Sequence, residues 1–137
     1  MEFPVRVYYE DTDVSGVVYH ANYLRWFERA RTEWLRGLGF DQERLLRESA
    51  AGFTVASLTV RYLSPARLDD ELLVVTRVTS LGKASIKFEQ QIQYARNAVV
   101  LAMASVRVGC ISVPGFRPQR IPEAIEVALS KERAHVG

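Results

Sequence analysis

The chain has 137 residues, of which 48% are hydrophobic and 25% are charged, and its formal net charge is +2. This length and balance predict one globular domain, residues 1–137, with a buried core, and they exclude a disordered chain. Because charges of both signs are interspersed, no nucleic acid is expected as a partner. The sequence shows no basic-then-apolar leader and no apolar span of about 20 residues, so we expect no transmembrane segment and a cytoplasmic location.

The N-terminal third predicts a strand, a turn and a long helix. Apolar and polar residues alternate from Phe3 to Glu10, as in a half-buried strand. Residues 11–18 form the turn, where Gly16 supplies the backbone freedom that a sharp reversal needs. Apolar residues then recur at spacings of three and four from Ala21 to Leu38, which predicts an amphipathic helix that Gly39 is suited to end.

Strand patterns dominate the rest of the sequence, after a short helix expected over residues 41–49. Runs of β-branched and aromatic residues predict four antiparallel strands, over residues 53–63, 72–81, 86–94 and 99–113. A weak terminal helix is expected over residues 123–131. These elements favour an α+β fold, in which a curved antiparallel sheet of about five strands wraps the long central helix. A free edge strand would invite pairing between subunits.

Residues 8–23 contain the side chains best suited to chemistry. Asp11 and Asp13 lie on the glycine-containing turn, and His20 follows at the expected start of the helix. A helix start offers unpaired N–H groups and a positive dipole end, which suit an oxygen that gains negative charge during a reaction. A carboxylate beside such donors has the parts needed to hydrolyse an activated acyl group.

Three segments carry a family resemblance, namely YEDTDVSGVVYHANY at residues 9–23, FERARTE at 27–33 and SPARLDD at 64–70. The first resembles the signature of the hotdog-fold 4-hydroxybenzoyl-CoA thioesterase family, and together they are similar to the bacterial Tol–Pal-system-associated acyl-CoA thioesterases. The similarity runs from about residue 4 to about residue 122, and the residues beyond are expected to form a peripheral tail. The resemblance implies a hotdog fold, hydrolysis of acyl-CoA to free acid and CoA, and a homodimer often paired into a homotetramer, with each active site between two subunits.

The resemblance also implies roles for single residues. The family's catalytic aspartate stands three residues before the glycine, which is Asp13 here, and its carbonyl-polarising N–H maps onto His20 or its neighbours. Asp13 acts either as a general base for water or as a nucleophile, and the imidazole of His20 is expected to orient the thioester or share a proton. The residues expected to contact substrate are Gly16, Val18, Tyr19 and Tyr23.

Each of these residues also has a structural alternative. Asp13 suits a turn cap, and Asp11 suits hydrogen bonds to the turn backbone that hold Asp13 in place. His20 also suits a helix cap. Glu28 is expected to pair with Arg25 or Arg31 on a solvated helix face rather than to act as a second catalytic carboxylate.

No metal or cofactor is expected. Asp11, Asp13, His20 and His135 lack a recognised ligand spacing, and Cys110 lies in an apolar run typical of a buried core residue. Basic residues suited to the phosphates of CoA are Lys83, Lys87, Arg96, Arg107, Arg117 and Arg120.

Two other functions compete with the thioesterase. One is a hotdog dehydratase that acts on chains carried by acyl carrier protein, although the proline-rich segment that follows the histidine in those enzymes is missing after His20. The other is a non-catalytic acyl-binding or assembly module.

Overall fold

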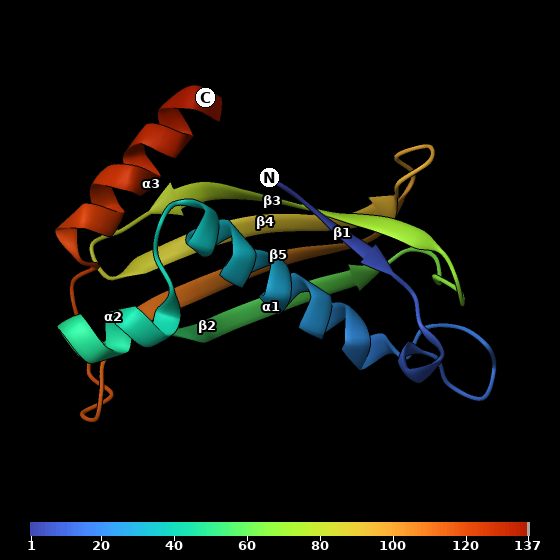
Figure 1. The fold of residues 1–137 in the computed structure, drawn as a ribbon, viewed down its shortest axis with the longest axis horizontal. Coiled ribbons are helices and arrows are strands. Elements are labelled where there is room, and N and C mark those ends of the chain that lie inside the picture. Colours follow the sequence, from blue (N-terminus) through green and yellow to red (C-terminus); the bar gives the residue numbers. More distant parts are fainter. Residues whose placement is uncertain (137) are drawn as a thin grey trace.

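The structure, a computed structural model, describes residues 1–136, with side chains described through Lys131. Five strands form one antiparallel sheet in the order β1-β3-β4-β5-β2, and α1 lies across one face of it (Figure 1). The elements are β1 (Glu2–Arg6), the 3-10 helix η1 (Tyr9–Asp11), α1 (His20–Gly37), α2 (Gln42–Ser49), β2 (Ala51–Tyr62), β3 (Glu71–Leu81), β4 (Ser85–Tyr94), β5 (Val100–Ser112) and α3 (Glu123–Val136). The predicted α+β class and the curved five-stranded sheet are confirmed.

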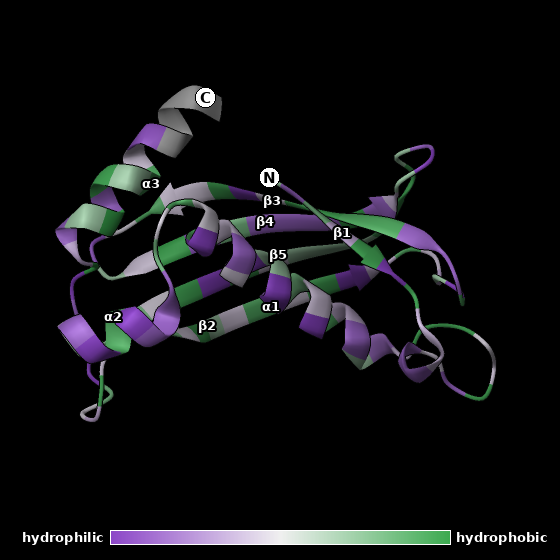
Figure 2. Ribbon diagram, in the orientation of Figure 1, coloured by the Kyte–Doolittle hydropathy of each residue, from purple (hydrophilic) through white to green (hydrophobic). Residues whose placement is uncertain are grey.

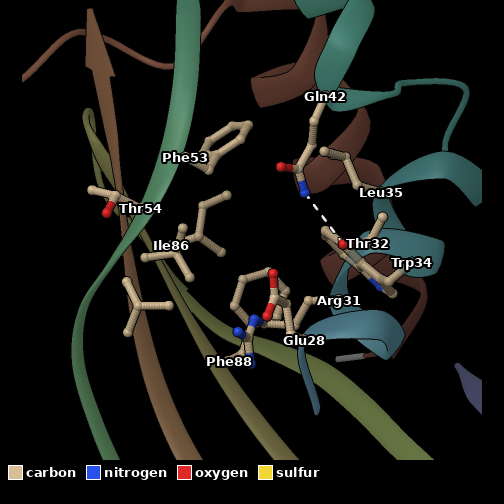
Figure 3. A pocket seen from close by; sticks show the side chains of 12 residues that line it. Glu28, Arg31, Thr32, Trp34, Leu35, Gln42, Phe53, Thr54, Ile86 and Phe88 are labelled. Carbon is tan, nitrogen blue, oxygen red and sulfur yellow. Dashed lines mark hydrogen bonds between the residues drawn. The ribbon is translucent and has the colours of Figure 1, made fainter. Parts of the chain in front are cut away.

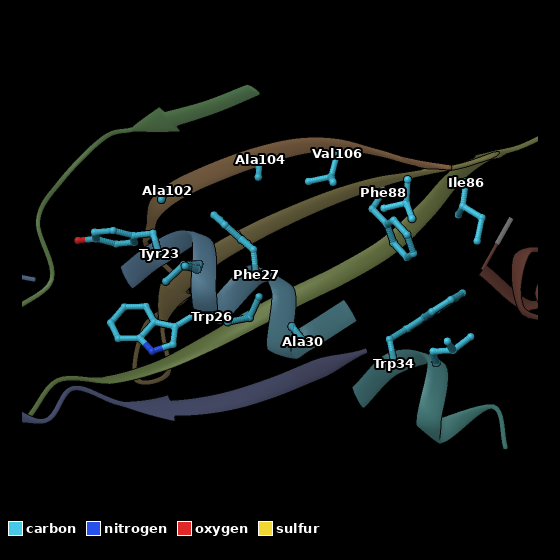
Figure 4. Close-up of a cluster of buried hydrophobic side chains, with 14 of the residues drawn as sticks. Tyr23, Trp26, Phe27, Ala30, Trp34, Ile86, Phe88, Ala102, Ala104 and Val106 are labelled. Carbon is cyan, nitrogen blue, oxygen red and sulfur yellow. The ribbon is translucent and has the colours of Figure 1, made fainter. Parts of the chain in front are cut away.

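α1 is amphipathic, and its apolar stripe packs onto the concave face of the sheet. The stripe is Tyr23, Trp26, Phe27, Ala30, Trp34 and Leu35, all buried. Figure 4 shows Phe27 and Trp34 of this stripe beside the strands, and the Trp34 and Phe88 rings form an edge-to-face pair with a centroid distance of 5.3 Å. Burying each large side chain contributes roughly 1.5–3 kcal/mol. Much of the face of α1 and α2 seen in Figure 2 is hydrophilic.

The end of α1 shows why Gly39 follows it. Gly39 has φ +95°, its N–H donates to the carbonyl of Arg36 at 2.9 Å, and the N–H of Phe40 donates to the carbonyl of Leu35 at 3.2 Å. These two bonds form a Schellman motif, whose left-handed residue is normally glycine. The predicted helix end is confirmed.

The first strand is shorter than the alternation predicted, since β1 ends at Arg6 rather than Glu10. The carbonyl of Tyr8 accepts the N–H of Asp11 at 3.0 Å, and that of Tyr9 accepts the N–H of Thr12 at 3.1 Å. These local bonds close η1 and carry the chain away from the sheet, toward the start of α1.

The C-terminal segment also differs from the expectation of a peripheral tail. The expected short helix is longer, as α3, and its Ile125 and Leu129 are completely buried, as is nearly all of Ile121. The three side chains belong to the cluster of buried hydrophobic residues that forms the core, called the core cluster below. Their burial makes the segment through Leu129 part of the packed structure.

β2 is an open edge of the sheet. It pairs with β5, and within residues 1–136 no strand pairs with its other side. Most of its residues are exposed, including Val55 at 47%, Leu58 at 40% and Tyr62 at 47%. Unpaired backbone groups beside apolar side chains are typical of a surface that another chain covers. Among the described helices none is long and apolar enough to cross a membrane.

Candidate functional site

The turn before α1 is a tight hairpin. The N–H of Asp13 donates to the carbonyl of Val17 at 2.9 Å, and Thr12 bridges Val18. Gly16 has φ +81° and donates its N–H to the carbonyl of Asp13 at 3.1 Å. A three-residue connection whose last residue is left-handed favours glycine there, as the sequence predicted.

The Asp13 carboxylate lies at the tip of this hairpin, exposed to solvent. Its Oδ1 accepts the N–H of Ser15 at 2.8 Å and also the Ser15 hydroxyl. Hydrogen bonds to the charged form stabilise it, so the Ser15 hydroxyl and N–H lower the pKa of Asp13 below its usual value. Asp13 therefore does stabilise the turn, and it is also a carboxylate held in its ionised form.

Replacing Ser15 by Ala tests this link between turn and charge. The variant loses the hydroxyl bond to Asp13 but keeps the backbone bond. The pKa of Asp13 should therefore rise toward its ordinary value, because a donor that favours the charged form has gone. If ionised Asp13 is needed for turnover, the acidic limb of the kcat/KM profile moves to higher pH, with little change on the plateau. A limb that stays in place would show that Asp13 does not control it.

Asp11 fastens the hairpin to the helix. Its Oδ2 accepts the N–H of Tyr8 at 2.8 Å, as the predicted turn contact requires, and its Oδ1 accepts the side-chain amide of Asn22 at 2.8 Å. Asn22 is only 5% exposed, and its own oxygen accepts a hydrogen bond from Arg25 at 3.1 Å. No role was expected for Asn22, although a polar residue inside an apolar helical stripe is a signal of such a tether.

His20 is the first residue of α1, and the N-cap residue Tyr19 makes no side-chain cap. The N–H groups of the first turn are therefore not taken by a capping side chain. The imidazole lies 4.6 Å from the ring of Tyr19 and 6.4 Å from that of Tyr62, whose hydroxyl donates to the His20 carbonyl at 3.0 Å. Within residues 1–136 no hydrogen bond joins the imidazole to Asp13.

The four residues expected to contact substrate fall into two groups. Gly16 and Tyr19 are exposed on the hairpin and at the helix start. Val18 and Tyr23 are 5% and 3% exposed and belong to the core cluster. The N–H of Val18 donates to the carbonyl of Ala66 at 2.9 Å, and the Tyr23 hydroxyl accepts the N–H of Ala66 at 2.9 Å. Burial favours a supporting role for Val18 and Tyr23 over ligand contact.

A cavity of about 290 Å³ lies between α1, α2 and the sheet (Figure 3). It is lined by Glu28, Arg31, Thr32, Trp34, Leu35, Gln42, Phe53, Thr54, Val55, Ile86, Phe88 and Val108. Neither Asp13 nor His20 is among these residues, and Glu28 lies about 12 Å along α1 from His20. In the described part of the chain Glu28 forms no salt bridge with Arg25 or Arg31, so the predicted ion pair is not seen.

Two of the six candidate CoA-binding cations lie together. Lys83 and Arg107 line one shallow surface hollow of about 750 Å³. Three others already have partners, since Lys87 lies 3.9 Å from Glu89, Arg120 lies 3.5 Å from Glu126, and Arg96 stacks on Tyr94.

Cys110 is buried, which raises the pKa of its thiol. The His135 side chain lies outside the described residues, and among those described no group of side chains is arranged to hold a metal ion.

The chain resembles known proteins over most of its length. Residues 15–100 match the sequence model of the thioesterase superfamily. The acyl-CoA thioesterase YbgC of Haemophilus influenzae is 48% identical over 127 residues, which cover 93% of this chain and 92% of that protein. The acyl-CoA thioester hydrolase YbgC of Escherichia coli O6:H1 is 48% identical over 123 residues, 90% of each chain.

The comparison with solved structures agrees with the two sequence comparisons. A probable thioesterase from Bartonella henselae matches with a TM-score of 0.83 and 37% identity, covering 89% of this chain and 98% of that one. The family expected from the motif is thus confirmed from the full sequence and from the fold. The chain is a member of the thioesterase superfamily, and its enzyme class is thioester hydrolase.

Proposed function

We propose that this chain hydrolyses acyl-CoA thioesters, with Asp13 as the catalytic carboxylate and the start of α1 as the oxyanion site. The observation that carries the proposal is the exposed, ionised Asp13 on a hairpin leading directly into a helix N-terminus without a side-chain cap. The names of the YbgC relatives support acyl-CoA as the substrate.

The chemistry needs few groups because a thioester carbonyl is electrophilic and a thiolate leaves readily. The carbonyl oxygen binds the N–H groups at the start of α1, which stabilise the oxyanion. Asp13 then takes a proton from water as the water attacks, or attacks the carbonyl itself to give a mixed anhydride that water hydrolyses. Both routes release CoA and the free acid, and both require Asp13 to be ionised.

Measuring free thiol released from a panel of acyl-CoA and acyl-carrier-protein thioesters tests this function. Hydrolysis with ordinary saturation supports the proposal, and the preferred panel member identifies the carrier. Water loss from a 3-hydroxyacyl thioester without thiol release would instead indicate a dehydratase. Tight binding without turnover would indicate an acyl-binding module.

The proposed active site is shared between two copies of the chain. The Phe53 end of β2 lines the cavity, whereas the Tyr62 end contacts His20, and about 30 Å of extended strand separates the two ends. A two-fold axis that pairs two β2 edges antiparallel would place the Tyr62 end of one copy beside the Phe53 end of the other. Each cavity would then meet the Asp13 hairpin of its partner, which supports a homodimer as the active unit.

Mixing two inactive variants tests the shared site. Asp13→Asn removes the carboxylate, and Gln42→Trp fills the cavity from α2, where Gln42 is exposed. Refolding an equal mixture should restore about a quarter of wild-type activity, because half of random dimers are mixed and each has one intact composite site. The two variants refolded separately are the controls. If the mixture is no more active than the two variants refolded separately, the cavity and the carboxylate of each site belong to the same chain.

A further inference from the structure

A guanidinium group opens into the otherwise largely apolar cavity. Arg31 extends from α1 into the space that Figure 3 shows, across from Phe53 and close to Phe88. Burial lowers the pKa of Arg31, while the nearby charge of Glu28 acts in the opposite direction. Keeping the charge of Arg31 in such a place costs solvation free energy. A role in binding a ligand would account for this cost.

Gln90 holds this guanidinium in place. The Gln90 side chain is 3% exposed, and its Nε2 donates both hydrogens, to the carbonyl of Phe27 at 3.0 Å and to Oγ1 of Thr76 at 2.9 Å. Its Oε1 must then face Arg31, whose terminal nitrogen donates to it at 2.9 Å. Because arginine has no acceptor, the opposite amide orientation is excluded. The buried amide therefore fixes where Arg31 points.

Most donors of Arg31 remain available. A guanidinium has five N–H donors, and among the side chains described, those of residues 1–131, the partner of this group is Gln90, with no salt bridge. In the same residues no buried side-chain nitrogen or oxygen lacks a partner. The other N–H groups of Arg31 are thus open to the accessible space, which on this side of α1 is the cavity.

The charges around the cavity indicate the kind of ligand atom that fits there. Glu28 and Arg31 both line the cavity, so their formal charges cancel. A carboxylate in the ligand would be attracted by Arg31 but repelled by Glu28. A hydroxyl accepts from Arg31 and donates to Glu28. The other two polar side chains on this wall, Thr32 and Gln42, already bond to each other at 3.3 Å.

We propose that Arg31, positioned by Gln90, is a specificity-determining residue that donates a hydrogen bond to a hydroxyl oxygen on the distal part of the acyl group. The inference rests on the proposed acyl-CoA hydrolysis, and it assigns the cavity to the acyl group. A site built to bond a substrate hydroxyl strongly disfavours the analogue that lacks it, because the protein donor is then left buried without a partner.

Three thioesters of equal chain length test the proposal: hexanoyl-CoA, 6-hydroxyhexanoyl-CoA and adipoyl-CoA. The wild-type protein should show the highest kcat/KM with the hydroxylated substrate. Arg31→Met keeps the bulk of the side chain and removes its donors. The ratio of kcat/KM for 6-hydroxyhexanoyl-CoA to that for hexanoyl-CoA should fall by about 10- to 200-fold in this variant.

Arg29→Gln is the matched control, because Arg29 is exposed on the same helix and does not line the cavity. It should leave the order of the three substrates unchanged. A wild-type protein that hydrolyses hexanoyl-CoA and its hydroxylated analogue equally would overturn the inference and leave the proposed function standing. A preference for adipoyl-CoA would overturn the hydroxyl assignment. Failure to hydrolyse any CoA thioester, while the protein remains folded, would instead remove the proposed function itself.

If Arg31→Met does not fold, a second variant, Arg31→Lys, tests the same proposal. Lysine keeps the positive charge but lacks the planar fork, so one ammonium cannot bond Gln90 and the ligand in the same geometry. A folded Arg31→Lys enzyme should retain hexanoyl-CoA hydrolysis and lose most of the preference for the hydroxylated substrate. Full preference in that variant would contradict the proposed bond.

Discussion

An Asp13→Asn enzyme is expected to lose nearly all turnover while keeping its fold and its assembly. Asparagine retains the oxygen that accepts both hydrogen bonds from Ser15, so the hairpin keeps its shape. It loses the negative charge that a general base or a nucleophile needs. We therefore expect kcat to fall by about 10²- to 10⁴-fold. Steady-state kinetics with the best acyl-CoA substrate measure the loss, and circular dichroism and sedimentation check the fold and the assembly.

Glu10→Gln is the matched control for this variant. Glu10 is an exposed carboxylate three residues before Asp13, in η1, and it does not line the cavity. Its loss changes the loop charge by the same amount and should leave kcat nearly unchanged. Retention of more than about a tenth of wild-type kcat by Asp13→Asn would remove Asp13 from the catalytic role.

A His20→Ala enzyme is expected to lose about 10²-fold in kcat if the imidazole orients the thioester or shares a proton. The substitution is structurally mild, because Tyr62 bonds the backbone carbonyl of His20 rather than its ring. The backbone N–H at the helix start is also kept. Near-normal kcat would show that the side chain is dispensable.

A second variant at this position isolates the backbone donor. His20→Pro removes the N–H as well as the imidazole, and proline is well tolerated at the first helical position. The preceding residue Tyr19 already has φ −63° and ψ 130°, a conformation that suits a residue before proline. If the His20 N–H polarises the thioester, His20→Pro should lose a further 10²-fold or more relative to His20→Ala. Equal activity of the two variants would assign the oxyanion to another N–H of the first turn.

The sequence by itself determined the elements and the chemistry-bearing segment. Helix and strand periodicities are local properties, so the extents of α1 and of the four later strands follow from a few neighbouring residues at a time. The turn at Gly16 and the helix end at Gly39 can be predicted for the same reason, because a left-handed backbone favours glycine wherever it occurs. The motif around Asp13 likewise led to the family, since its residues are contiguous.

The tertiary structure alone decided which distant residues meet. Arg31 reads as one more charge on a solvated helix, and Gln90 as a polar residue in phase with the apolar positions of its strand, with no partner that a local pattern identifies. Only the fold brings these two residues, which are 59 positions apart in the sequence, within one hydrogen bond of each other. The same holds for Asn22, whose partner Asp11 lies on the hairpin, and for α3, whose weak local pattern gave no sign that Ile125 and Leu129 would be buried. Burial and pairing of this kind depend on which elements pack together, a property of the whole chain that no local pattern contains.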